Sequence, residues 1–127
     1  MLANGFETME FSPFVDIMGW AYNDYGYNVR VVTCGFQQKV ISAFNISVIV
    51  DTIIDDIIVN EYDALAIPGG FEEYGFYREA YSEKFLNIIR EFNNYNKIIA
   101  SVCVGALPLG KSGVLKNRRA TTFYRVS

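Results

Sequence analysis

Two short runs of mostly apolar residues constrain the fold of this chain more than any other feature of its sequence. Residues 64–67 and 97–102 each have the length of a strand, and glycines follow within a few residues of each. Strands that read as continuous apolar runs are typical of parallel sheets, which are covered by helices on both faces. The two runs therefore predict buried parallel strands in an α/β domain.

Helical and strand-like patterns alternate along the rest of the chain. We expect strands over 1–3, 28–34, 46–50 and 119–123, a hairpin strand over 39–42, and helices over 7–25, 82–94 and 105–112. One apolar face of the first helix consists of Phe11, Phe14, Val15 and Met18. Thr8 is a candidate cap at the start of that helix, and Gly26 fits its end. This alternation predicts a mostly parallel sheet with helices on both faces.

Length and charge limit the classes of partner. A chain of 127 residues forms a single domain, 1–127, and 11 basic against 14 acidic residues give a net charge of −3. Proteins that bind nucleic acid carry basic patches, so no nucleic-acid partner is expected. The sequence has neither the pattern of a signal peptide nor an apolar run long enough to span a membrane. We therefore expect a cytoplasmic protein with no membrane partner.

The chain contains no histidine, which limits the chemistry available to it. A Ser-His-Asp or Cys-His site within one chain is excluded, and so is a zinc site with a histidine ligand. Two cysteines, Cys34 and Cys103, are too few for a Cys₄ zinc site or a disulfide framework. We expect no metal and no cofactor.

Cys103 stands at the point where an apolar strand meets a helix. The segment 98–106 has a strand, a reactive residue, one further residue, a glycine and then a helical pattern. This is the layout of a nucleophile elbow, with Ser101 at the first small position and Cys103 as the nucleophile. The N–H groups at the start of a helix favour a thiolate, so a lowered thiol pKa is expected. Cys34 lies within a strand pattern and is interpreted as a small buried apolar residue.

Two further features lie at the same edge of the predicted sheet. Gly69 and Gly70 follow a buried strand and either form an ordinary turn or supply N–H donors, together with Val104, to an oxyanion. Glu7 and Glu10 open the first helix, where carboxylates are favoured by the helix dipole alone. If one of them faces the thiolate, one of the two groups must be neutral, because like charges raise each other's pKa.

Four motifs in this order resemble the ThiJ/PfpI superfamily, and within it the branch that contains the parkinsonism-associated protein deglycase. They are Ala3-Asn4-Gly5-Phe6-Glu7-Thr8-Met9-Glu10, Leu65-Ala66-Ile67-Pro68-Gly69-Gly70, Ala100-Ser101-Val102-Cys103-Val104-Gly105-Ala106 and Ala120-Thr121-Thr122. The resemblance implies a flavodoxin-like three-layer α/β sandwich and a homodimer. It also implies that Cys103 is the reactive, oxidation-sensitive cysteine, that Glu10 is the carboxyl group beside it, and that Gly69, Gly70 and Val104 form the anion or oxyanion pocket.

The chain departs from this pattern in three ways. Members commonly have a histidine after the paired threonines, whereas Phe123 and Tyr124 follow them here. Tyr124 could reach the pocket instead. The chain also begins inside the first strand and stops before the closing strands and helix, so we expect a partial domain, incomplete on its C-terminal side.

These features leave three hypotheses about function. The first is a cysteine-dependent enzyme of glyoxalase or deglycase type, acting on small reactive carbonyl compounds through Cys103 and Glu10. The second is a non-catalytic oxidative-stress sensor or chaperone-like protein that uses the same cysteine, and the third is a truncated, inactive remnant. Peptidase or amidotransferase activity is not expected, because the chain has no histidine to act as a base.

Overall fold

The computed structural model describes residues 1–123 of the chain. The helices are α1 (Thr8–Tyr25), α2 (Phe76–Ala80), α3 (Glu83–Asn94) and α4 (Ala106–Ser112). The strands are β1 (Cys34–Gly35), β2 (Lys39–Ile41), β3 (Ser47–Ile49), β4 (Thr52–Ile53), β5 (Ala64–Ile67) and β6 (Ile98–Ser101). Residues Cys103–Gly105 form a 3₁₀ turn that leads into α4.

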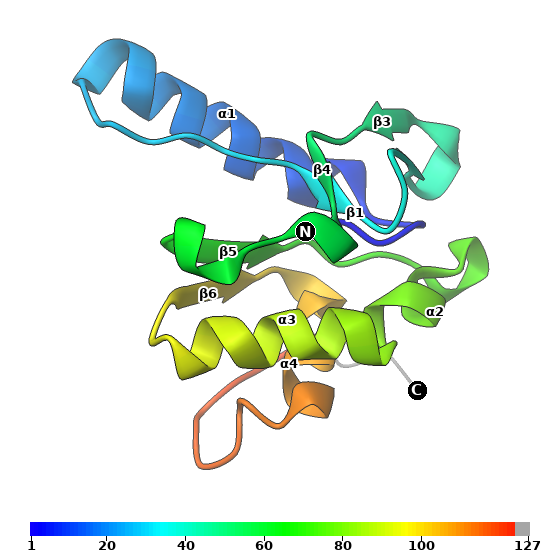
Figure 1. Ribbon diagram of the computed structural model, residues 1–127. Helices are drawn as coiled ribbons and strands as arrows, with labels where there is room; N and C mark the ends of the chain where they lie inside the picture. The colour runs from blue at the N-terminus through cyan, green and yellow to red at the C-terminus, as the bar shows by residue number, and fades with distance from the viewer. Residues whose placement is uncertain (124–127) are drawn as a thin grey trace.

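The parallel pairs β1–β4 and β5–β6 form the middle layer of the molecule. Residues 1–3 lie between these pairs, because the N–H of Leu2 donates to the Cys34 carbonyl at 2.7 Å and the amino group of Met1 donates to the Ala66 carbonyl at 2.8 Å. Helix α1 covers one face, and α3 and α4 lie on the other (Figure 1). The fold is the α/β sandwich with parallel strands that the sequence predicts, and β2–β3 adds the expected antiparallel hairpin.

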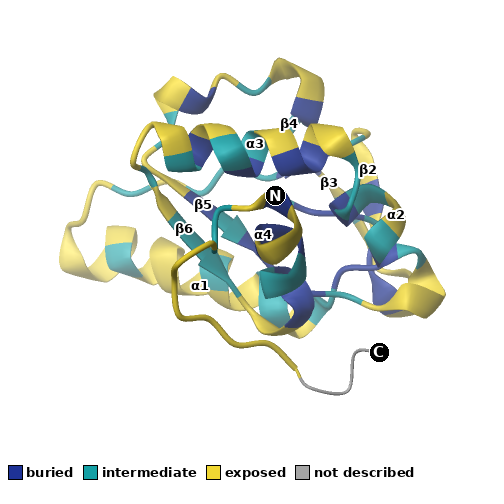
Figure 2. Cartoon of the chain, turned by 90° about the horizontal axis from the view of Figure 1, so that it is seen from below, coloured by how far each residue is buried: buried dark blue, intermediate teal, exposed yellow. Residues whose placement is uncertain are grey.

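The main core lies between the β5–β6 pair and helix α3. Four apolar side chains on one face of α3 are buried: Phe85, Leu86, Ile89 and Phe92. They pack in the same cluster as Leu65 and Ile67 of β5. Figure 2 shows this as alternating buried and exposed positions along the helix. Spacing of three and four residues places these side chains on one face, as predicted for 82–94.

Helix α1 has the predicted length but is less buried than its apolar pattern indicates. Glu7, rather than Thr8, is its N-cap, and the Glu7 side chain accepts a hydrogen bond from the N–H of Met9. Gly26 ends the helix as expected, in the left-handed conformation with φ of 70°. No residue of α1 is buried, because the helix covers the sheet layer only with half-buried side chains such as Phe11 and Phe14.

Two predicted strands are wrong or largely wrong. Within 28–34 only Cys34 belongs to a strand, because residues 1–3 reach no further than Cys34 and the backbone bonds of Thr33 to Asp51 and Thr52 do not continue to residues 28–32. Residues 119–123 are not a strand either. They are exposed, and none of the described strands pairs with them.

Truncating the core face of α3 tests this architecture. Ile89→Ala removes a fully buried side chain, so it should lower the free energy of unfolding by about 3 kcal/mol. The control Ile58→Ala alters a side chain that is 58% exposed and should change it by less than about 0.5 kcal/mol. Urea unfolding followed by circular dichroism measures both. Equal small effects, or the absence of a cooperative transition in the parent chain, would contradict this core.

Candidate active site

Cys103 lies in a strained turn between β6 and α4. Its φ is 54°, in the left-handed region that residues with a side chain adopt at a cost of about 1–3 kcal/mol. The turn is so tight that a Cβ on Gly105 would lie 2.6 Å from the carbonyl oxygen of Ile67. Only glycine therefore lets α4 start this close to β5. In this strained conformation, the exposed Cys103 side chain lies at the carboxyl edge of the parallel strands.

Glu10 reaches this edge from the first turn of α1. Its Oε2 accepts a hydrogen bond of 2.7 Å from the N–H of Gly69, and its carboxyl group is also hydrogen-bonded to the Cys103 thiol. Burial raises the pKa of Glu10, and the negative charge of Glu7 adds a smaller increase. The hydrogen bonds from Gly69 and Cys103 oppose this rise without cancelling it.

The pKa of the Cys103 thiol is also raised. Burial is the main cause, the charge of Glu10 is the next, and the hydrogen bond from the Val104 N–H opposes both. The lowered thiol pKa expected from the helix start is therefore wrong in direction. A short turn with one N–H donor does not outweigh partial burial beside a carboxylate.

Cys103 and Glu10 form a coupled acid pair. Because ionisation of either group makes ionisation of the other harder, the two protons leave in separate steps. After the first proton has left, the pair holds one proton between a sulfur and a carboxylate oxygen. This arrangement places a nucleophile beside a group that can both accept and donate a proton.

The glycines that follow β5 have different surroundings. A Cβ on Gly69 would lie 2.7 Å from Glu10 Oε2 and 3.1 Å from the Val104 nitrogen, so glycine is required for Glu10 to approach. The Gly69 N–H is already occupied by Glu10. Gly70 instead forms an isolated antiparallel bridge with Phe6. The structure thus brings Cys103, Glu10, Gly69 and Val104 together and directs Gly70 toward a neighbouring backbone segment.

Two residues near Cys103 are not identified as site residues by the sequence. The Thr122 hydroxyl donates to the Cys103 carbonyl at 3.0 Å, and the only signal for it is its place in the paired-threonine motif. Tyr77 has no sequence signal at all. Its pKa is raised to about 12 by burial, by Tyr81 and Glu72, and by the charge of Cys103, so its hydroxyl keeps its proton at neutral pH. Tyr124 lies outside the described residues.

Within residues 1–123, no group of three or more metal-binding side chains of histidine, cysteine, aspartate or glutamate is present. In the same part of the chain, no helix has the length and apolar character needed to cross a membrane.

Comparison with known proteins identifies the family of the chain. The model of the DJ-1/PfpI family matches residues 1–127, the whole chain. The chain belongs to the DJ-1/PfpI family. A solved structure of oxidized Toxoplasma gondii DJ-1 has a TM-score of 0.79 at 25% identity, over 95% of this chain and 63% of that one. The family assignment agrees with the resemblance carried by the four motifs and with the flavodoxin-like fold.

The curated relatives carry DJ-1 and deglycase names. An Arabidopsis thaliana protein named DJ-1 homolog D is 45% identical over 73 residues, which are 57% of this chain and 18% of the relative. A deglycase from Pyrococcus horikoshii is 30% identical over 125 residues, which are 97% of this chain and 69% of the relative. The chain spans between 18% and 57% of the length of three such relatives, the homologues D and B and a Pyrococcus furiosus deglycase.

Removing the Glu10 charge tests the coupling within the acid pair. Glu10→Gln should lower the pKa of the Cys103 thiol, because the charge of Glu10 raises it in the parent chain. The matched variant Glu7→Gln should lower it less, since the charge of Glu7 is the smallest of the causes. Thiolate absorbance against pH, in a Cys34→Ala background, gives the values. An unchanged or raised thiol pKa in Glu10→Gln would rule out the coupling.

Proposed function

We propose that this protein is a cysteine-dependent enzyme that acts on small reactive carbonyl compounds, of glyoxalase or deglycase type. The observation that carries the proposal is the Glu10 carboxyl group, hydrogen-bonded at once to the Cys103 thiol and to the Gly69 N–H. Family membership and the deglycase names of several relatives support it. No histidine is needed, because Glu10 supplies the proton-transfer group.

The reaction begins with transfer of the Cys103 proton to Glu10. The sulfur attacks the aldehyde carbon, the carbonyl π electrons move to oxygen, and Glu10 returns the proton to that oxygen to give a hemithioacetal. With methylglyoxal as the example, Glu10 then moves a proton from the carbon bonded to sulfur to the neighbouring carbonyl oxygen, which gives an enediol. The hydroxyl on the carbon bonded to sulfur then loses its proton, and the neighbouring carbon gains one, which gives a lactoyl thioester. The resulting thioester is hydrolysed by water, which releases lactate and restores the thiol.

The negative oxygen formed during attack needs hydrogen-bond donors. The Val104 N–H is the nearest candidate, because it already donates to the sulfur of Cys103. Gly69 completes the proposed pocket, and its N–H becomes available only when Glu10 moves away from it. Gly70 bridges Phe6 instead and is left out of the pocket. Donors fixed in place before the reaction stabilise such charge more effectively than water does.

We also propose that the protein acts as a homodimer. Several large apolar side chains of α1 are exposed, among them Ile17 at 63% and Trp20 at 55%. A helix with no buried residue is stabilised when a second surface covers such side chains. Size-exclusion chromatography with light scattering measures the oligomeric state directly.

Loss of the Cys103 sulfur tests the enzymatic proposal. Cys103→Ser should reduce methylglyoxal consumption by at least about 100-fold, because a serine hydroxyl at this site has no strong base to activate it. The control Cys34→Ser alters a buried cysteine away from the edge and should keep activity within about threefold of the folded parent chain. Full turnover by Cys103→Ser would refute the proposed nucleophile.

A second candidate function, an oxidative-stress sensor, is favoured by the exposure of Cys103. A sulfinate formed on this sulfur could accept hydrogen bonds from the Val104 N–H and from a protonated Glu10, whose pKa is raised. Cys34, in contrast, is buried. Exposure and hydrogen bonds to the oxidised form both direct oxidation to Cys103.

Selective oxidation distinguishes the two cysteines. Mild peroxide should add two oxygen atoms to Cys103 and leave Cys34 unchanged, as measured by mass spectrometry of the peptides. Glu10→Ala should reduce the yield of the sulfinate, because one of its hydrogen-bond partners is lost. Oxidation of Cys34 in preference to Cys103 would contradict the sensor function.

A further inference from the structure

Glu7 is a charged neighbour of Cys103 that the proposed reaction does not use. It is the N-cap of α1, and its Oε1 accepts a hydrogen bond of 3.3 Å from the N–H of Met9. The N–H of Glu7 donates to the Gly69 carbonyl at 2.9 Å. These two hydrogen bonds hold Glu7 beside the same glycine whose N–H binds Glu10.

Gly69 lies between Glu7 and the turn that carries Cys103. A Cβ on Gly69 would lie 3.1 Å from the nitrogen of Val104, the residue that follows Cys103. Gly69 therefore contacts Glu7 through its carbonyl and this turn through its Cα. Over this short separation the charge of Glu7 reaches the sulfur, and it adds to the rise in the pKa of the Cys103 thiol.

The charge around Cys103 is negative within the part of the chain that the structure describes. Glu10 and Glu7 both raise the pKa of the Cys103 thiol, and no basic side chain of residues 1–123 is among the causes that lower it. Several basic side chains have partners elsewhere: Lys84 with Asp55, Arg90 with Glu83, Arg118 with Asn93, and Lys111 with the ring of Tyr81. A reagent that approaches Cys103 therefore meets two half-buried carboxylates.

The charge of the substrate decides how much repulsion the reaction meets at this edge. Before attack, Cys103 and Glu10 share one negative charge, and this charge moves to the carbonyl oxygen as the carbon–sulfur bond forms. A neutral aldehyde therefore adds no charge to the site. An aldehyde with a carboxylate of its own adds a second negative charge beside that of Glu7. Like charges at this range repel each other more strongly near a protein surface than in bulk water.

We propose that Glu7 is a specificity-determining residue, which disfavours anionic electrophiles at Cys103 and admits neutral and cationic ones. Glu7 acts through its charge and contacts no reacting atom. The substrate class that follows is carbonyl compounds without a carboxylate, sulfonate or phosphate group close to the aldehyde. This substrate class rests on the proposed enzymatic function, whereas the selection by charge at the sulfur does not.

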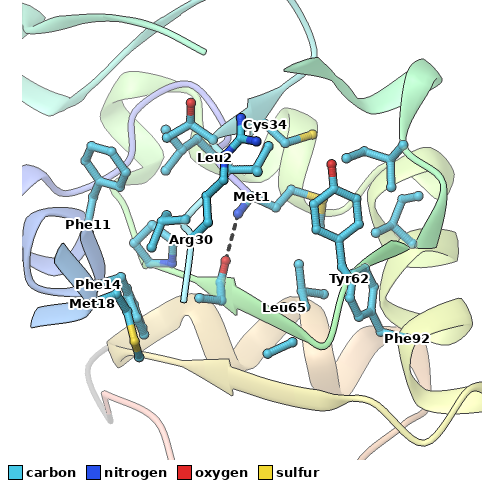
Figure 3. Close-up of a pocket in the computed structure, with 18 of the residues that line it drawn as sticks. Met1, Leu2, Phe11, Phe14, Met18, Arg30, Cys34, Tyr62, Leu65 and Phe92 are labelled. Atoms are coloured by element: carbon cyan, nitrogen blue, oxygen red, sulfur yellow. Dashed lines mark hydrogen bonds between the residues drawn. The ribbon is translucent and has the colours of Figure 1, made fainter. Parts of the chain in front are cut away.

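The second cysteine has surroundings of a different kind. Cys34 is buried and lines a mostly apolar cavity of about 190 Å³, together with Leu2, Leu65 and Phe92 (Figure 3). No acidic side chain of the described residues lines this cavity. A signal from Cys34 would therefore obscure the effect of Glu7, so every measurement uses a Cys34→Ala background in which Cys103 is the only thiol.

Two methanethiosulfonate reagents of opposite charge test the proposal at the sulfur. One carries a trimethylammonium group and the other a sulfonate, and with either one the thiolate forms a disulfide while methanesulfinate leaves. The ratio of the two rates, cationic over anionic, is divided by the same ratio for N-acetylcysteine amide, a small neutral thiol. For Cys103 this normalised ratio should be at least about tenfold at low ionic strength. Because both reagents meet the same thiolate, the ratio does not depend on the thiol pKa.

A matched pair of variants assigns the selection to Glu7. Glu7→Gln removes the charge, keeps an oxygen for the Met9 N–H, and should lower the normalised ratio at least about threefold. Glu91→Gln, on the exposed side of α3, changes the net charge equally and should leave the ratio within about 1.5-fold. Glu7→Ser, which also caps a helix, provides a second uncharged variant. Circular dichroism checks the fold of each variant.

Salt and a pair of substrates extend the test. Raising the ionic strength from about 0.01 M to about 1 M shortens the screening length from about 30 Å to about 3 Å, so the normalised ratio should approach one. The substrates are 4,5-dioxopentanoate and its methyl ester, which share the oxoaldehyde group of methylglyoxal and differ by one negative charge. At low salt, kcat/KM should favour the ester at least about tenfold, and Glu7→Gln should reduce this preference at least about threefold.

The outcomes separate this proposal from the enzymatic one. A normalised ratio near one in the parent chain, or an equal ratio in the parent and the folded Glu7 variants, would overturn the role of Glu7. A ratio as large at high salt as at low salt would indicate steric selection and would overturn it too. Equal kcat/KM for the two oxoaldehydes would refute the substrate class alone. If neither oxoaldehyde is consumed while the cationic reagent is still favoured, the enzymatic function and its substrate class fail, and the selection by Glu7 stands.

Discussion

The parallel pairing of β5 with β6 is the interaction on which the rest of the structure depends. Its register sets Ile67 opposite Ser101, so the two strands end side by side. The residues that follow them, Gly69 on one strand and Cys103 on the other, therefore meet at one edge. Burial of the α3 face against these strands holds the pair in place. Without this register, neither the turn at Cys103 nor the contact between Gly69 and Glu10 could form.

The acid pair at that edge explains how a protein without histidine could handle proton transfer. A thiol whose pKa is raised is a poor nucleophile until its proton leaves, and Glu10 is in position to take it. The same burial that raises both pKa values strengthens the interaction between the two groups. In the proposed function, the reactivity of Cys103 is therefore a property of the pair.

Helix α1 is packed tightly at its start and loosely along the rest of its length. The helix is anchored at its start, where Glu7 donates its N–H to the Gly69 carbonyl and Glu10 reaches Gly69. Further along, its apolar side chains face a cavity rather than a filled sheet layer. The site end is thus held firmly, while the rest of the helix keeps exposed apolar side chains such as Ile17 and Trp20.

Local sequence was sufficient for some features and insufficient for others. Apolar runs predicted β5 and β6, because a strand that is covered on both faces needs apolar side chains at successive positions. Apolar residues at spacings of three and four predicted the core face of α3. The juxtaposition of Cys103 with Glu10 was anticipated through the motif resemblance, since both follow strands of one sheet. The direction of their pKa shifts, the raised pKa of Tyr77 and the absence of a strand over residues 28–33 were decided only by tertiary structure. These depend on burial, on nearby charges and on which strand lies alongside, and residues distant in the sequence supply all three.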